Sequence, residues 1–99
     1  KEFRFVPYRR LIGSKLHVDR ELNKLADWCD AQYEKVDKRN NSIALENNCF
    51  ETYASHSFAH MGIKFNSGES ATMFIKELNK VENEGYKQYF IRLLKEKRL

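Results

Sequence analysis

The sequence is poor in cysteine and has no long apolar run. It contains two cysteines, Cys29 and Cys49, and no apolar stretch near the roughly 20 residues that cross a bilayer. Two cysteines are too few for the disulfide framework of a small secreted domain, so we interpret both as buried thiols. No short apolar segment follows a basic start, as in a secretion signal. These absences predict a soluble, intracellular protein of the cytoplasm or nucleus, with no membrane partner.

Sequence patterns typical of catalysis and of metal or phosphate binding are also missing. A zinc site needs two close ligand pairs, whereas Cys29 and Cys49 are 20 residues apart and only His56 and His60 form a close pair. There is no turn that would expose a nucleophile beside a base, and no glycine-rich phosphate loop with its lysine. We therefore predict no catalytic residue, no metal site and no cofactor, and hence no enzyme.

The composition is sufficient for one hydrophobic core. Hydrophobic residues make up 41% of the sequence and aromatic residues 13%, which is ordinary for a globular protein. A chain of 99 residues has room for a single domain, which we place at 1–99. Because the first residue is Lys rather than Met, we interpret the chain as a domain cut from a longer protein.

The apolar pattern of the first half predicts a strand and then a long helix. Residues 2–8 alternate as a half-buried strand would, and Pro7 would place that strand at a sheet edge. Apolar residues with a 3.6-residue period predict an amphipathic helix over 19–36, with Asp19 as its N-cap.

The second half predicts strands followed by two helices. Alternation over 43–46, 50–53 and 58–65 predicts a two- or three-stranded antiparallel meander, with Asn47-Asn48 in a turn. A capping box that begins at Asn66 predicts a second helix to about Glu82, ended by Gly85. The spacing of apolar residues favours a third helix over 86–98, with a strand as the alternative there. The predicted fold class is therefore α+β.

Residues 58–79 resemble the second half of an RNA-recognition motif. The resemblance is carried by a strand ending in Ile63-Lys64-Phe65, then Gly68-Glu69-Ser70-Ala71 and a helix. The base-stacking aromatic positions of that family fall on His60 and Gly62, and the family has a strand where this sequence predicts its last helix. We therefore assign no family.

Charge is distributed unevenly along the chain. Residues 1–16 hold five basic residues and one acidic residue, and residues 86–99 hold the same numbers, which gives each end a net charge of +4. The segment between them holds eight basic and twelve acidic residues, a net charge of −4. If the fold brings the two ends together, they will form one positive face.

The basic ends predict a non-enzymatic recognition module that binds nucleic acid, either RNA or DNA. Lysine and arginine would contact phosphates while aromatic or imidazole rings stack on bases. The predicted phosphate contacts are Arg4, Arg9, Arg10, Arg92, Lys95 and Arg98, and the predicted stacking residues are Tyr8, Phe58 and His60.

The alternative is a protein-interaction or dimerisation module. The last predicted helix carries more apolar residues than one stripe requires, which favours a protein partner or a homodimer. Trp28 lies beside the apolar stripe of the long helix, where an exposed tryptophan would be a binding hot spot. The predicted residues of this alternative site are Trp28, Tyr86, Tyr89, Phe90 and Leu94.

Overall fold

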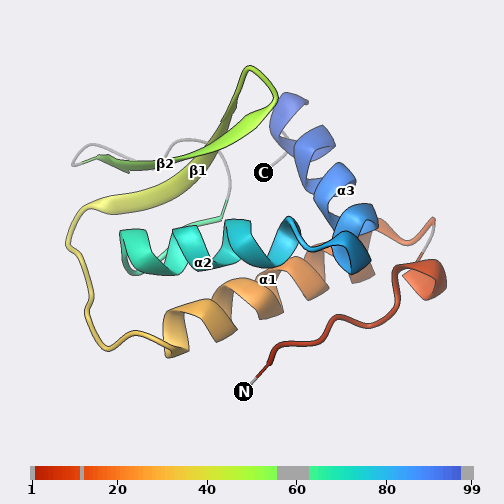
Figure 1. Ribbon diagram of the computed structural model, residues 1–99, viewed down its shortest axis with the longest axis horizontal. Coiled ribbons are helices and arrows are strands. Elements are labelled where there is room, and N and C mark those ends of the chain that lie inside the picture. Colours follow the sequence, from red (N-terminus) through yellow and green to blue (C-terminus); the bar gives the residue numbers. More distant parts are fainter. Residues whose placement is uncertain (1, 12, 56–62, 97–99) are drawn as a thin grey trace.

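The computed structural model describes residues 2–11, 13–55 and 63–96, and it confirms the predicted α+β class. The elements are η1 (Tyr8–Leu11), α1 (Lys15–Ala31), β1 (Asn40–Glu46), β2 (Cys49–Ser55), α2 (Gly68–Leu78), η2 (Val81–Asn83) and α3 (Glu84–Lys95). Figure 1 shows α2 between α1 and the β1–β2 hairpin, with α3 crossing one end of this arrangement.

The predicted N-terminal strand is not formed. Residues 2–7 have no sheet partner among the described residues and lie against helices instead. The Phe5 ring stacks on Tyr86 with 4.0 Å between centroids, and the Val6 N–H donates to Glu21 Oε1 at 3.0 Å. The Tyr86 hydroxyl donates to the Val6 carbonyl. Alternation predicted a segment covered on one side, whereas Phe3 and Phe5 from one side and Val6 and Tyr8 from the other all pack against the core.

Helix α1 lies about one turn earlier in the sequence than predicted. It begins at Lys15 with Ser14 at the N-cap, so the prediction of Asp19 as N-cap was wrong. The Asp19 carboxylate instead accepts a hydrogen bond from the Tyr89 hydroxyl at 3.0 Å. Val36, predicted within the helix, lies beyond its end and is 67% exposed. The predicted stripe is correct from Leu22 to Cys29, where Leu22, Leu25, Ala26 and Cys29 are buried, but its continuation to Tyr33 lies beyond the helix.

The hairpin confirms two of the predicted strands and the turn between them. Asn47 and Asn48 both have positive φ, 51° and 62°, as a two-residue hairpin turn requires and as asparagine tolerates. Residues 58–62 of the predicted third strand lie outside the described residues. In its described part, the Phe65 N–H donates to the Asn41 carbonyl at 2.9 Å, which forms an isolated bridge rather than a strand.

The two cysteines differ in exposure. Cys29 is buried as predicted, and burial, with smaller effects of Glu77 and Asp30, raises the pKa of its thiol to about 12. Cys49 is exposed, so its predicted burial was wrong. It follows the hairpin turn directly and pairs with Glu46, the last residue of β1.

Helix α2 begins one residue later and ends earlier than predicted. Ser67, rather than Asn66, is the N-cap, and its side chain accepts a hydrogen bond from the Ser70 N–H at 3.2 Å. The helix ends at Leu78 instead of continuing to about Glu82. The 3-10 turn η2 then redirects the chain into α3.

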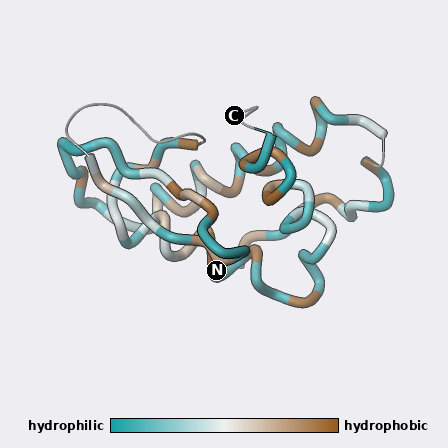
Figure 2. The backbone as a smooth tube through the Cα atoms, turned by 90° about the horizontal axis from the view of Figure 1, so that it is seen from above, coloured by the Kyte–Doolittle hydropathy of each residue, from teal (hydrophilic) through white to brown (hydrophobic). Residues whose placement is uncertain are grey.

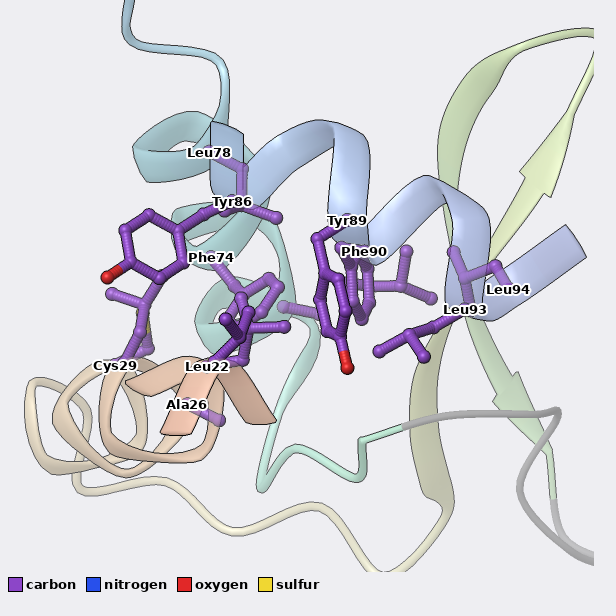
Figure 3. Close-up of a cluster of buried hydrophobic side chains, with 14 of the residues drawn as sticks. Leu22, Ala26, Cys29, Phe74, Leu78, Tyr86, Tyr89, Phe90, Leu93 and Leu94 are labelled. Carbon is purple, nitrogen blue, oxygen red and sulfur yellow. The ribbon is translucent and has the colours of Figure 1, made fainter. Parts of the chain in front are cut away.

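Helix α3 confirms the predicted third helix and places its apolar face in the core (Figure 3). Gly85 lies in the first turn of α3, so its prediction as a C-cap was wrong. Phe74 of α2 and Phe90 of α3 pack edge to face at 5.3 Å, and Phe50 of β2 lies 5.7 Å from Phe90. Apolar and polar positions alternate along the helices in Figure 2, as expected where each element buries one side.

Candidate nucleic-acid interface

The structure brings parts of the two basic ends of the sequence together. Turn η1, the start of α1 and helix α3 lie at the same end of the molecule (Figure 1). Five exposed cations lie on these three elements, and we call them the basic surface: Arg9, Arg10, Lys15, Arg92 and Lys95. Four of these residues were predicted as phosphate contacts from the sequence.

A cavity of about 120 Å³, which we call the basic pocket, lies where these elements meet. Its lining residues come from both ends of the chain: Tyr8, Leu11, Gly13, Ser14, Lys15, Val18, Tyr89 and Arg92. Two of the lining side chains are cationic and, among the described residues, none is a carboxylate. The pocket therefore favours an anion over a cation.

Arg92 is held in place by its own helix. Its guanidinium carbon lies 5.8 Å from the centroid of the Tyr89 ring, within the range of a cation–π interaction. The Tyr89 hydroxyl in turn donates to Asp19 of α1 at 3.0 Å. The ring that Arg92 contacts is therefore itself hydrogen-bonded to α1.

Tyr8 is positioned by the first turn of α3. Its ring lies edge-on to Tyr86, with 5.2 Å between centroids. A Cβ atom at Gly85 would lie 2.7 Å from two carbons of the Tyr8 ring, closer than side chains approach. Only glycine at this position lets the tyrosine pack on the helix, where it also lines the basic pocket.

The cations of the basic surface are not neutralised within the part of the chain that the structure describes. The ion pairs there join Lys24 to Glu21, Arg39 to Asp37 and Lys80 to Glu77, at 2.9–3.1 Å. Hydrogen bonds from Arg39 lower the pKa of the Asp37 carboxyl to about 2. None of these ion pairs includes a cation of the basic surface, so its five cations leave their charge to solvent or to a ligand.

Other predicted nucleic-acid residues do not join this surface. Arg4 lines a different cavity of about 250 Å³, and Glu2 and Glu82 line the same cavity and offset its charge. Phe58, His60 and Arg98 lie outside the described residues.

Sequence reasoning missed Lys15 as a site residue. Placing the start of the helix at Asp19 left Lys15 in a loop with no defined neighbours. The signal that could have found it was the basic N-terminal segment together with Gly13-Ser14, a turn in which Gly13 has φ +85°. Ser14 Oγ lies in hydrogen-bond contact with His17 Nδ1 and does not cap the helix.

The alternative protein-interaction residues are mostly internal. Tyr86, Tyr89, Phe90 and Leu94 are all buried in the core (Figure 3). Trp28 is half-buried, with its ring 5.8 Å from Phe3. The large apolar residues that are exposed, Leu16, Val36 and Val81, lie on separate segments, as is normal for a protein surface.

A larger cavity, of about 460 Å³, is lined by residues of α2 together with Thr52 of β2 and Tyr33. Glu69 and Lys76 both line it, so it carries no excess of either charge. Within residues 2–11, 13–55 and 63–96, no three His, Cys, Asp or Glu side chains are grouped to hold a metal ion. In the same ranges, no helix combines the length and the apolar character needed to cross a membrane.

Comparisons with protein-family models, with curated proteins and with solved structures find no match to this chain. The arrangement of the basic surface is therefore the basis for a functional proposal.

Proposed function

We propose that the protein is a non-enzymatic recognition module that binds nucleic acid through the basic surface. The single observation that carries this proposal is that Tyr8 and Arg92, at opposite ends of the sequence, line one pocket with Lys15 and no carboxylate among the described residues. Exposed cations that lack an internal partner gain most from a polyanion, because binding releases the counterions condensed on its phosphates.

Burial of the alternative site supports this choice. An interface made from Tyr86, Tyr89, Phe90 and Leu94 would require the core to open, whereas Arg9, Arg10, Arg92 and Lys95 are already exposed. Tyr8 is half-buried beside these cations, and its ring would supply a stacking surface next to the phosphate contacts.

The test is binding to labelled single- and double-stranded RNA and DNA by fluorescence anisotropy at several salt concentrations. We expect affinity to fall linearly on a log–log plot, with a slope of about −0.7 per phosphate contact for single strands and −0.9 for duplex DNA. In the double variant Lys15→Ala/Arg92→Ala, the slope should decrease by the amount expected for about two phosphate contacts. This variant should bind roughly 100-fold more weakly.

The matched control is Lys35→Ala/Lys38→Ala, which removes the same charge from two exposed lysines in the loop after α1. That loop is separated from Lys15 by the length of α1, 17 residues or about 25 Å. The control should keep the salt slope of the unmodified protein. Equal losses in both double variants would mean that net charge, and not the basic surface, drives binding.

A further inference from the structure

We infer that the basic pocket binds the terminal phosphate of a single nucleic-acid strand. This inference rests on the proposed function and specifies which group of the nucleic acid occupies the pocket.

The size of the pocket indicates a small group. Its volume of about 120 Å³ is below the roughly 300–1,000 Å³ of cavities that enclose whole small-molecule ligands. A phosphate group is small enough for a space of this order, whereas a nucleoside is not. The sugar and base of the terminal nucleotide must then remain outside, next to the rim.

The charge of the pocket matches a phosphate monoester better than a diester. Lys15 and Arg92 line the pocket from two different elements, and no carboxylate lines it among the described residues. A terminal phosphate monoester carries a charge of about −1.5 to −2 at pH 7, whereas each internal phosphodiester carries one negative charge. The two cations therefore neutralise a monoester, whereas the single negative charge of a diester would neutralise only one of them.

The geometry of Arg92 adds to this match. Its guanidinium is restrained by the Tyr89 ring at 5.8 Å, and Tyr89 is restrained by Asp19. A planar guanidinium can donate two parallel hydrogen bonds to one phosphate, which requires free oxygens on that phosphate. Arg92 would occupy two oxygens in this way, so a monoester keeps a third oxygen for Lys15, whereas both free oxygens of a diester are already in use.

Tyr8 gives the rest of the terminal nucleotide a surface to contact. It lines the basic pocket and is half-buried, with its ring packed on Gly85. An unpaired base that extends from a phosphate in the pocket is free to turn and stack on an aromatic ring at the pocket edge. A single-stranded end provides such a base, whereas the last base of a blunt duplex is held by its pairing partner.

The experiment compares three internally labelled single strands of one sequence, with hydroxyl ends, a 5′-phosphate or a 3′-phosphate. We expect one phosphorylated strand to bind at least tenfold more tightly than the hydroxyl-ended strand. Arg92→Ala should abolish this preference. Lys95 is an exposed cation one turn further along α3. Lys95→Ala should weaken the binding of all three strands by the same factor and keep the preference for the phosphorylated strand.

The outcomes separate this inference from the proposed function. Equal binding of the three strands would overturn the inference and leave nucleic-acid binding in place. No binding of any strand at low salt would overturn the proposed function. A phosphoserine or phosphotyrosine peptide that binds more tightly than every strand would assign the pocket to a protein ligand and overturn the inference.

Discussion

The two faces of α3 carry residues of both functional sites that the sequence predicts, and they differ in burial. Tyr86 and Phe90, from the predicted protein interface, are 2% and 1% exposed. Arg92 and Lys95, from the predicted nucleic-acid interface, are exposed on the same helix. One face therefore contributes to the stability of the fold, and the other is available to a ligand.

This difference shows why a broad apolar pattern is weak evidence for a partner in a small domain. The inner face of α3 meets Phe74 of α2, Phe50 of β2 and Phe5 of the N-terminal segment. A helix with neighbours on several sides needs more than one apolar stripe. Its excess of apolar residues is then used within the chain, whereas lysine and arginine are almost never fully buried without a partner.

The largest expected effect comes from changing the inner face. Phe90→Ala should lower the free energy of unfolding by about 3–5 kcal/mol, because it removes a buried ring and leaves a cavity beside Phe74. Urea unfolding measures the change. Arg92→Ala, two residues along the helix, should stay within about 0.5 kcal/mol of the unmodified protein. Similar losses in both variants would contradict the division between the two faces.

The next effect concerns Gly85, where the N-terminal segment meets α3. An alanine within a helix is ordinarily more stabilising than glycine, by about 0.5–1 kcal/mol. Here its Cβ would lie 2.7 Å from the Tyr8 ring, so Gly85→Ala should instead destabilise the protein by about 1–3 kcal/mol. It should also weaken nucleic-acid binding, because Tyr8 must leave its position at the basic pocket.

The sign of the change in stability decides this prediction. A stabilised Gly85→Ala variant would mean that Tyr8 does not pack on α3. The double variant Tyr8→Ala/Gly85→Ala provides the control, since removal of the ring should relieve the clash and make the two changes non-additive.

Much of the secondary structure followed from local patterns in the sequence. The stripe of α1 and the Asn47-Asn48 turn were predicted correctly, because helical periodicity and the tolerance of asparagine for positive φ are properties of a few neighbouring residues. The ends of α1 were not predicted correctly. Val18 extends the stripe towards the N-terminus, and periodicity alone does not say which polar residue at the edge of a stripe is the cap.

The candidate site depended on contacts between distant parts of the chain. The charge count predicted that the ends would form a positive face if they met, and the structure brings Tyr8 and Arg92 to one pocket. No local pattern indicates that Gly85 makes room for Tyr8 or that Asp19 holds Tyr89. These residues are separated by about 70 positions or more, so only the tertiary packing of α1, α3 and the N-terminal segment defines the pocket.

The smallest expected effect tests how the N-terminal segment is attached to the inner face of α3. Tyr86→Phe keeps the ring that stacks on Phe5 but removes the hydroxyl that donates to the Val6 carbonyl. Loss of one hydrogen bond should cost about 1 kcal/mol of stability at neutral pH. Salt-dependent binding of nucleic acid should change little, because Tyr86 does not line the basic pocket.

The pH dependence of the stability lost in Tyr86→Phe tests whether the buried hydroxyl is responsible for that loss. Burial, with smaller effects of Glu21 and Tyr8, raises the pKa of Tyr86 from 10.0 to about 12. A group whose pKa is raised on folding stabilises the protein fully below its unfolded pKa and loses that contribution as pH rises through the folded value. The difference between the unmodified protein and Tyr86→Phe should therefore be constant up to about pH 10 and shrink above it, as measured by urea unfolding from pH 8 to pH 11.5. A difference that stays constant across this range would mean that the hydroxyl is not buried against the N-terminal segment.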